Sequence, residues 1–368
     1  MTDISIDSLP LPAGLGEPGG RDFAAAAELE DAAWAELLGH GDFCEGPRRR
    51  LAREQPSDYS TSLRLVARDT GAGGTIVGTA SLWLPVAENT DMAVVHVAVA
   101  PGHRRRGIGS GLFAAAERES ASRGRTKLNS WVNYPEAPLS GADGALAPSD
   151  GDGGVSADAP ATRFAVGVGM ELKQVERVSR LEVAGAGAVM ARLEAEARSA
   201  AAEDYDVVGW VGPVPDDAVE DYCRMIERMD TDPPMGGLEW EQSVWDEARL
   251  RVAEDREARR GSFSVHTCAV HRRTGELVAF SVLEVVRDLP EVAFQEDTLV
   301  MGEHRGHRLG LLVKTANYRR LLGAWPGVRR IYTWNAEEND HMLGINEAMG
   351  FRPVHAEGAW EKKLVIKG

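Results

Sequence analysis

Short segments in which hydrophobic and polar residues alternate lie along the whole chain, separated by segments with helical spacing of apolar residues. A period of two is typical of half-buried β-strands, and apolar residues three and four apart are typical of helices that pack on a sheet. Strands are predicted near 4–9 and at 62–68, 75–85, 92–100, 126–133, 205–211, 262–270, 277–286, 292–300 and 330–334, with a further strand at the C-terminus. Helices are predicted at 22–38, 108–122, 187–203, 216–229, 239–259, from 309 onward and at 341–349.

The predicted elements follow the same order in both halves: strand, helices, three strands, a basic loop, helix, strand, helix and strands. This order predicts an α/β fold (α+β mixed sheet), with one central mixed sheet flanked by helices in each half. We therefore expect an N-terminal domain at 1–184, a connecting helix at 185–203 and a C-terminal domain at 204–368. Residues 135–161 contain no Lys or Arg and little to bury, so we expect a mobile acidic loop there.

A segment rich in Arg and Gly occurs twice, at 96–112 and at 297–313, and Arg305 corresponds to Arg104 (305 − 104 = 201). Repeats of short structural units have periods of about 20–50 residues, so this long period indicates two copies of a whole domain. In each copy a strand precedes the basic loop and a helix follows it, which directs backbone N–H groups and a helix dipole at an anion. A dinucleotide-binding fingerprint would need a different glycine spacing directly after a first strand.

Composition narrows the classes of partner. The chain has 368 residues and a net charge of −16, which argues against nucleic acid because phosphate binding needs a basic surface. An acidic surface suits a cationic amine, and it also serves solubility alone. The three distant cysteines argue against disulfides and against a metal site. We find no run of about 18 apolar residues and no signal-peptide pattern, so we expect a cytoplasmic protein without a membrane partner.

The two basic loops resemble the signature of the GCN5-related N-acetyltransferase (GNAT) superfamily, Arg/Gln-x-x-Gly-x-Gly/Ala after the fourth strand. Arg104-Arg-Arg-Gly-Ile-Gly109 fits this signature, and Arg305-Gly-His-Arg-Leu-Gly310 fits it except that Arg308 replaces the first glycine. A later segment of the second half is similar to the family's Asn-x-x-x-Asn motif before a helix that ends in Gly-Phe. The first half contains only a degenerate copy of that motif. The chain as a whole is identified as a tandem GNAT protein.

The resemblance implies that the loops cradle the pyrophosphate of acetyl-CoA or another acyl-CoA, a phosphopantetheine thioester. It also implies that Asn339 contacts the cofactor arm. The implied cofactor-binding residues lie on the strand ends, the loops, the helix starts and the asparagine motif: Val97, Val99, Arg104, Arg105, Arg106, Gly107, Ile108, Gly109, Ser110, Leu299, Val300, Arg305, Gly306, His307, Arg308, Leu309, Gly310, Asn335, Asn339 and Asn346.

The family usually places a general base on the fourth strand, four or six residues before the strand valine. Both positions are apolar in the first half, whereas Glu296 stands four residues before Val300 in the second. Glu296 is therefore the expected base, acting through a water. Asp297 is the second catalytic candidate, but it points to the other face of the strand unless a bulge intervenes, and a structural hydrogen bond is its alternative role. His96 aligns with Asp297, and we expect a packed histidine there.

The family's usual general acid is a tyrosine five residues before the Gly-Phe phenylalanine, and here Asn346 stands at that place. His341 or Tyr332 could serve instead, or the thiolate could leave unassisted. We expect the second half to be catalytic, and the first half to bind cofactor without turnover or only to support the fold. The expected activity is acyl transfer, most simply of acetyl, from acyl-CoA to the amine of a small molecule. The alternatives are an acyl carrier protein as donor, and a non-catalytic acyl-CoA-binding protein.

Overall fold

The computed structural model describes residues 4–139, 141, 143–201 and 203–364, which form two compact units. The first unit comprises Met1–Val175, Gly236–Glu239 and Ala356–Gly368, and the second comprises Glu176–Met235 and Trp240–His355. This division differs from the linear one expected from the sequence, with boundaries at 184 and 204. The reason is the last strand, which belongs to the first unit because Ala356–Lys363 pairs antiparallel with Lys127–Tyr134.

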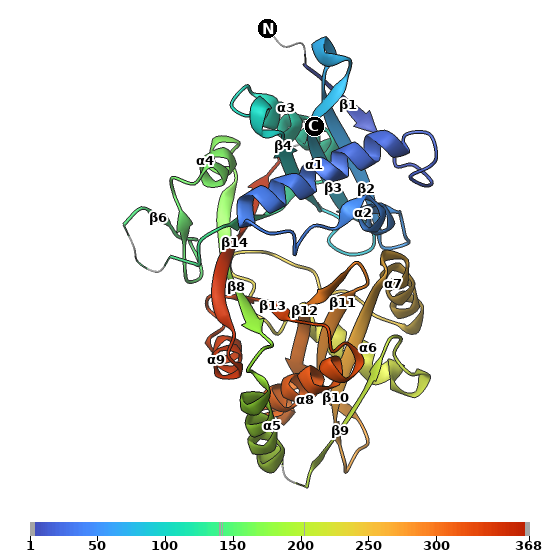
Figure 1. Cartoon of the computed structure of the whole chain (residues 1–368), viewed down its shortest axis with the longest axis vertical. Coiled ribbons are helices and arrows are strands. Elements are labelled where there is room, and N and C mark those ends of the chain that lie inside the picture. The colour runs from blue at the N-terminus through green and yellow to red at the C-terminus, as the bar shows by residue number, and fades with distance from the viewer. Residues whose placement is uncertain (1–3, 140, 142, 202, 365–368) are drawn as a thin grey trace. The chain divides into compact units, whose positions relative to one another are not determined.

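The sheet of the first unit has the strand order β1-β2-β3-β4-β5-β14 (Figure 1). Its neighbouring strands are antiparallel, except for β4 and β5, which are parallel. The strands are β1 (Ile4–Leu9), β2 (Ser60–Asp69), β3 (Thr75–Pro85), β4 (Met92–Val99), β5 (Lys127–Tyr134) and β14 (Arg352–Lys363), and a separate short pair is formed by β6 (Ala145–Leu146) and β7 (Val155–Ser156). The helices are α1 (Gly20–Leu38), α2 (Gly46–Glu54), α3 (Ile108–Ser122) and α4 (Pro160–Gly167).

Alternation along the strands divides the core of the first unit into two layers. Leu65 and Ala67 of β2 pack in the cluster that contains α3 residues, whereas Val66 between them packs with Phe23 of α1 and Leu51 of α2. Successive side chains of a strand point to opposite faces, so helices cover both faces of this sheet.

The second unit has a sheet with the order β8-β13-β12-β11-β10-β9, in which β12 and β13 are the parallel pair. Its strands are β8 (Glu171–Glu182), which begins in the first unit, β9 (Tyr205–Val211), β10 (Ser262–His271), β11 (Leu277–Val286), β12 (Leu289–Val300) and β13 (Arg330–Ala336). The helices are α5 (Gly187–Ala201), α6 (Val219–Met229), α7 (Glu247–Arg260), α8 (Leu309–Ala324) and α9 (Asp340–Met349).

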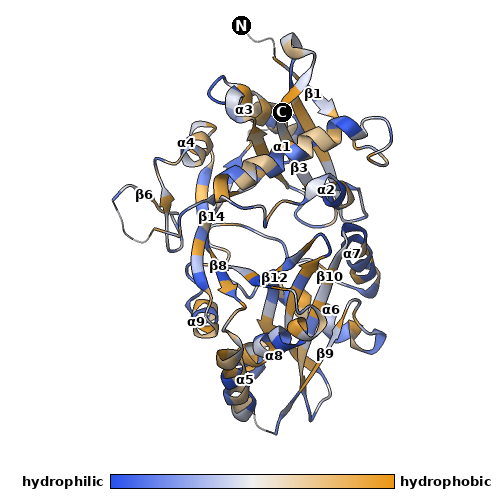
Figure 2. Ribbon diagram, viewed as in Figure 1, coloured by the Kyte–Doolittle hydropathy of each residue, from blue (hydrophilic) through white to orange (hydrophobic). Residues whose placement is uncertain are grey.

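Two hydrophobic clusters lie on the two faces of this second sheet. One joins the sheet to α5 and α8 through residues such as Leu193 and Leu312, and the other joins it to α6 and α7 through Met225 and Leu250. Figure 2 shows hydrophobic colour along the strands β10 and β12 and mainly hydrophilic colour on α7. The helix α7 is held by its buried residue Leu250 and by its polar contacts.

The helix predicted at 239–259 begins only at Glu247, which corrects that prediction. Asp246 caps it, since its carboxylate accepts a hydrogen bond from the Arg249 N–H at 2.8 Å. Before the cap, the N–H groups of Ser243 and Trp245 donate to side chains of α6 and the residues that follow it. Those bonds hold the backbone in an extended course and remove the first turns of the predicted helix.

The segment 135–161 contains regular structure rather than only a loop. Its residues 140 and 142 lie outside the described residues, but β6 and β7 pair within it and Val155 is buried. One buried apolar side chain and a two-residue ladder are enough to place this part of the segment against the first unit's core.

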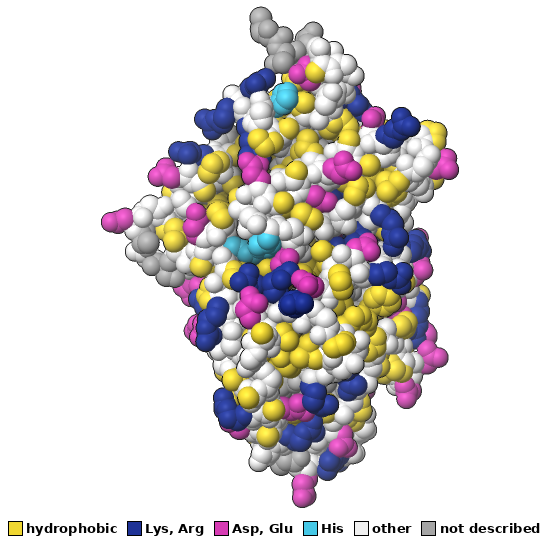
Figure 3. All heavy atoms as spheres, viewed as in Figure 1, with side chains coloured by type: hydrophobic (Ala, Val, Ile, Leu, Met, Phe, Trp, Pro, Cys, Tyr) yellow, Lys and Arg dark blue, Asp and Glu magenta, His cyan; other side chains and the backbone are white. Residues whose placement is uncertain are grey.

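Charged side chains of both signs are interspersed on the face drawn in Figure 3. Within the described part of the chain, no helix has the length and apolar character needed to cross a membrane. The same residues include no group of three or more His, Cys, Asp or Glu side chains placed to hold a metal ion.

Candidate active site

The two parallel strands of the second unit separate at one point. β12 and β13 pair from Val292 and Arg330 to Gln295 and Thr333, and the ladder ends there although both strands continue. Backbone N–H and C=O groups are obligatory hydrogen-bonding groups, so the facing edges beyond this point can bind an extended ligand that carries amides. In the first unit β4 and β5 separate in the same way after Val94 and Asn129.

A β-bulge lies where β12 leaves β13. In the ladder with β11, Ser281 opposes Thr298 and Leu283 opposes Gln295, so Val282 alone faces both Glu296 and Asp297. A bulge of this kind inserts one extra residue and reverses the alternation of side chains beyond it. The corresponding ladder between β3 and β4 runs from Gly78–Val99 to Trp83–Val94 without a shift.

The bulge places both acidic side chains on the same face of the sheet. Ala293 packs in the cluster with α5 and α8, so by alternation Glu296 takes the opposite face. Beyond the bulge, Leu299 packs with α6 and α7, and Asp297, two residues earlier, shares that face. The structure thus provides the bulge on which the catalytic role of Asp297 depended.

The side chain of Gln295 holds this bulge together. In the sequence, its only signal is that it is a polar residue within an otherwise mainly apolar strand segment. Its side chain is buried, and Nε2 donates to the carbonyl oxygens of Val282 at 2.7 Å and of Glu296 at 3.3 Å. Nε2 also reaches the Ser281 hydroxyl at 3.1 Å. These bonds satisfy the carbonyl groups that the irregular ladder would leave without partners.

We expect Gln295→Met to lower the free energy of unfolding by about 1–3 kcal/mol, because buried carbonyl groups lose their donors. The loss is measured by urea denaturation and by hydrogen exchange of the β11 and β12 amides. Thr298→Val is the matched control, since it removes a hydroxyl that contacts Ser281 at 3.2 Å and Nε2 of Gln295 at 3.4 Å, but it leaves the bonds from Gln295 to the two carbonyl groups in place. An equal or smaller loss in Gln295→Met would show that the bulge does not depend on this side chain.

The environment of the two carboxyl groups disfavours their charge. Desolvation by the surrounding protein raises the pKa of Glu296 to about 8, and the carboxylates of Glu284 and Asp297 add to this shift. Desolvation also raises the pKa of Asp297 to about 6, with a further contribution from Asp230. Both side chains are exposed to solvent. Perturbed carboxyl groups that solvent can reach are typical of acid–base sites.

Both basic loops have the same backbone course, in which two residues adopt left-handed conformations. These are Arg105 (φ 62°) and Gly107 (φ 82°) in the first unit, and Gly306 (φ 88°) and Arg308 (φ 57°) in the second. At the offset of 201, each loop therefore has one glycine and one arginine at these positions, in opposite order. A non-glycine residue there costs roughly 1–2 kcal/mol. The replacement of glycine by Arg308 leaves the loop conformation intact, and its side chain lies 3.7 Å from Glu196 of α5.

The first arginine of each loop braces the loop in both units. Nε of Arg104 donates to the carbonyl of Val99 at 2.9 Å, and its guanidinium binds Glu36 of α1. Nε of Arg305 donates to the carbonyl of Val300 at 3.3 Å, and Nη2 binds Asp232 at 2.7 Å. These exposed ion pairs fix the turn, so the backbone N–H groups and the helix start remain as the principal groups for an anion.

The residues that follow the loops divide into packed and exposed ones. Ile108 and Leu309 are buried at the first helical position, whereas Arg106 and Ser110 are exposed. A Cβ on Gly109 would lie 3.2 Å from the Phe164 ring, and one on Gly310 would lie 3.5 Å from Ile345. These two glycines therefore allow the helix to approach its neighbours closely. His307 is half-buried, with its ring centre 5.4 Å from that of Tyr205.

The asparagine motif has structural partners. The Asn339 side chain caps α9 by accepting a hydrogen bond from the Met342 N–H at 3.2 Å. Nδ2 of Asn346 donates to Oδ1 of Asn335 on β13 at 2.6 Å, and Oδ1 of Asn346 is buried without a hydrogen-bond partner among the described residues. These contacts join α9 to the strand that borders the separation, and an amide at position 346 offers no ionisable proton.

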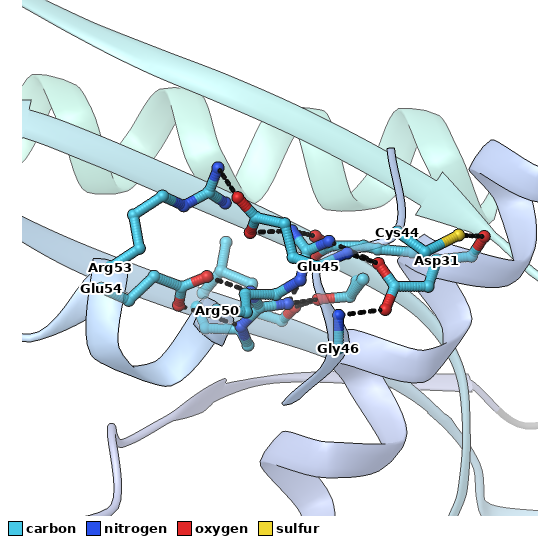
Figure 4. Close-up of polar contacts among 11 residues, drawn as sticks. Asp31, Cys44, Glu45, Gly46, Arg50, Arg53 and Glu54 are labelled. Carbon is cyan, nitrogen blue, oxygen red and sulfur yellow. Dashed lines mark hydrogen bonds and ion pairs between the residues drawn. The ribbon is translucent and has the colours of Figure 1, made fainter. Parts of the chain in front are cut away.

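The first unit has buried ion pairs beneath α1 and α2. Arg64 is fully buried and binds both Glu30 and Glu54. Arg50 binds Asp31 at 2.8 Å, and its neighbour Arg53 binds Glu45 (Figure 4). Opposing charges that are hydrogen-bonded in this way hold one another, so they are not free for acid–base work.

His96 of β4 is exposed, which corrects the expectation of a packed histidine. Desolvation by the surrounding protein and the charge of Arg53 lower its pKa to about 4. A histidine with this pKa is neutral near pH 7 but is a weak base. The first unit therefore has the separated strands and the loop, but it lacks the bulge and the carboxyl pair.

Comparisons with known proteins find a matching family and similar structures. Residues 27–138 match the acetyltransferase (GNAT) family. No curated protein matches the sequence closely enough to count as a relative. The chain is similar to the solved structure of a tandem GNAT protein from the clavulanic acid biosynthesis pathway, with 25% identity, a TM-score of 0.72 and 100% of each chain covered.

Two further solved structures share the fold. One is a GNAT from Sphaerobacter thermophilus, with 14% identity, a TM-score of 0.61 and coverage of 98% of this chain and 96% of that chain. The other contains a glucosamine N-acetyltransferase region in a fungal multi-domain GH3 β-N-acetylglucosaminidase, with 14% identity, a TM-score of 0.61 and coverage of 98% of this chain and 38% of that chain. The expected fold class, α/β with two such domains in tandem, is confirmed.

Proposed function

We propose that this chain, a member of the GNAT superfamily with two domains in tandem, transfers an acyl group from an acyl-CoA to the amine of a small molecule. The transfer takes place in the second unit. The single observation that carries this proposal is that the bulge at Glu296 and Asp297 lies where β12 separates from β13.

The residues of the second unit fit an acyl-CoA. The unpaired edges of β12 and β13 match the amides of a pantetheine arm, and the loop from Arg305 to the start of α8 presents N–H groups to a pyrophosphate. When bound, the acyl-CoA supplies an activated thioester. The protein's own part is to orient the amine, to remove its proton and to supply a proton to the leaving sulfur.

The acceptor side of the site favours a cationic amine. Glu296 and Asp297 share their face with Glu257 of α7 and with Asp230 beyond α6, so negative charge surrounds the position that the amine would take. We propose the first unit as a domain that binds cofactor without turnover, because its strands separate but the carboxyl pair is replaced by Val95 and His96.

Matched charge reversals in the two loops test the assignment to the second unit. His307→Glu and Arg106→Glu occupy equivalent positions (307 − 106 = 201), and His307→Gln and Arg106→Gln are their neutral controls. Acetyl-CoA binding is measured by calorimetry, and transfer is measured as CoA release with spermidine, glucosamine, tryptamine and lysine methyl ester. We expect His307→Glu to weaken transfer at least about tenfold more than Arg106→Glu, because a carboxylate at this helix start repels phosphate.

The opposite order of losses would place the reaction in the first unit. Acetyl-CoA binding without transfer to any of the four amines would favour a binding protein. Transfer from an acylated carrier protein but not from acetyl-CoA would show that the donor is the carrier protein and not acyl-CoA.

A further inference from the structure

Glu296 has more carboxylates near it than Asp297 has. Glu296 lies within the field of Glu284 on β11, Glu257 on α7 and Asp297 itself, and Arg260 of α7 is the cation that opposes them. That cation is shared, because Nη2 of Arg260 lies 3.6 Å from Oε1 of Glu284. The carboxylate that acts on Asp297 is Asp230. Removing a proton from Glu296 therefore meets more repulsion than removing one from Asp297.

Other titratable groups reach the same place from the elements packed against it. Tyr222 of α6 is buried, its hydroxyl lies 2.9 Å from Nδ1 of His266, and burial together with Cys268 and Asp297 raises its pKa. Burial lowers the pKa of His266 to about 4, so this pair is neutral near pH 7. Neither group supplies a positive charge that would stabilise two ionised carboxylates at the bulge.

We propose that Glu296 and Asp297 hold one proton between them, with Asp297 as the base toward the acceptor amine and Glu296 as the acid toward the leaving sulfur. This inference rests on the proposed acyl transfer, and it reverses the sequence-based choice of Glu296 as the base. Its geometric basis is the bulge, which brings two adjacent carboxyl groups to one face at the point where the strands separate. Two carboxylic acids whose environments differ commonly divide the two roles in this way.

This division of roles makes Glu296 the proton donor at a site where Asn346 stands in the place of the family's usual tyrosine. Asp297 accepts the proton that the ammonium group loses, and the free nitrogen pair forms the bond to the thioester carbon. As the carbon–sulfur bond breaks, its electron pair goes to sulfur, which takes the proton of Glu296. Glu296 regains a proton from the nitrogen as the neutral amide forms, and Asp297 releases its proton to water.

The test is an NMR titration of the whole chain labelled with ¹³C at the Asp and Glu carboxyl carbons. Glu296→Gln and Asp297→Asn assign the two signals and keep the shape of the side chains. We expect Asp297 to titrate near 6 and Glu296 near 8. In Asp297→Asn the Glu296 midpoint falls because a neighbouring charge is gone, whereas in Glu296→Gln the Asp297 midpoint stays near 6.

Two carboxyl groups that both ionise below pH 5 would overturn the inference. This titration needs neither donor nor acceptor, so its result does not depend on whether the protein transfers an acyl group. Failure of the proposed function would be seen separately, as the absence of transfer by the unaltered protein.

A second measurement compares acetyl-CoA with S-acetyl-4-nitrothiophenol as donors, using the amines named above. The aromatic thiolate leaves without a proton, so Glu296→Gln should lose at least tenfold less activity with this donor than with acetyl-CoA. Asp297→Asn should lose the same factor with both donors. Equal losses in Glu296→Gln for the two donors would overturn the role of Glu296 as the acid.

Discussion

Asp297→Asn is expected to lower kcat/KM for acyl transfer by about 10²–10⁴-fold near pH 7, because an amide cannot accept the proton of the ammonium group. The measurement is CoA release from acetyl-CoA under substrate-limited conditions. His96→Asn is the matched control, since His96 occupies the equivalent position of the first unit (297 − 96 = 201). A comparable loss in His96→Asn would place the reaction in the first unit.

The pH dependence of the unaltered protein follows from the same two groups. The pKa of Asp297 is raised to about 6, so its base form is lost and kcat/KM falls as the pH drops through 6. The pKa of Glu296 is raised to about 8, so its acid form is lost and the rate falls as the pH rises through 8. We expect a bell-shaped profile with its maximum between these values, and Asp297→Asn should abolish the acidic limb. A rate that is independent of pH between 5 and 7 would contradict this assignment.

Arg64→Ala is expected to lower the free energy of unfolding of the first unit by about 3–5 kcal/mol, because it leaves the buried carboxylate of Glu54 without its ion-pair partner and that of Glu30 with Arg50 alone. Arg64 is fully buried, Glu30 and Glu54 are its partners, and its Nη1 also donates to the Thr79 hydroxyl at 3.2 Å. Burial works against ionisation of Glu30, yet Arg64 and Arg50 hold its pKa below the ordinary value. The measurement is hydrogen exchange of the amides of β2, which carries Arg64, and of β3, which pairs with it.

The matched control is Arg104→Ala, which removes an exposed arginine that binds Glu36 through two nitrogens. Exposed pairs contribute about 0–1 kcal/mol, so this variant should change little. Similar losses in both variants would mean that the buried ion pairs do not hold α1 and α2 on the sheet.

The two units share a fold but differ in the charged groups beside their sheets. Arg64 and its partners fill the space beneath α1 and α2 of the first unit, whereas Glu296 and Asp297 of the second unit lie on the sheet face that packs against α6 and α7 and are exposed to solvent. The second unit has carboxyl groups whose pKa values are raised mainly by desolvation, and neighbours of like charge add to the shift.

Much of the architecture could be predicted from local patterns in the sequence. Alternation predicted the strand β3, the spacing after Ile108 and Leu309 predicted the helices α3 and α8, and the constant offset predicted two similar units. These features depend on residues close together in the chain. The position of Glu296 four residues before Val300 likewise identified the strand that carries the acidic pair.

Other features arise only from contacts between distant parts of the chain. The bulge depends on how Gln295 meets Val282 across the ladder, and no pattern within β12 specifies that register. The last strand pairs with β5, which lies more than 200 residues earlier, and this pairing decides the extent of the first unit. The sequence by itself determined the elements, their order and the candidate residues, because those depend on neighbours along the chain. Only the tertiary structure decided the face on which Asp297 lies and the charges around it, because these depend on which strands and helices come together.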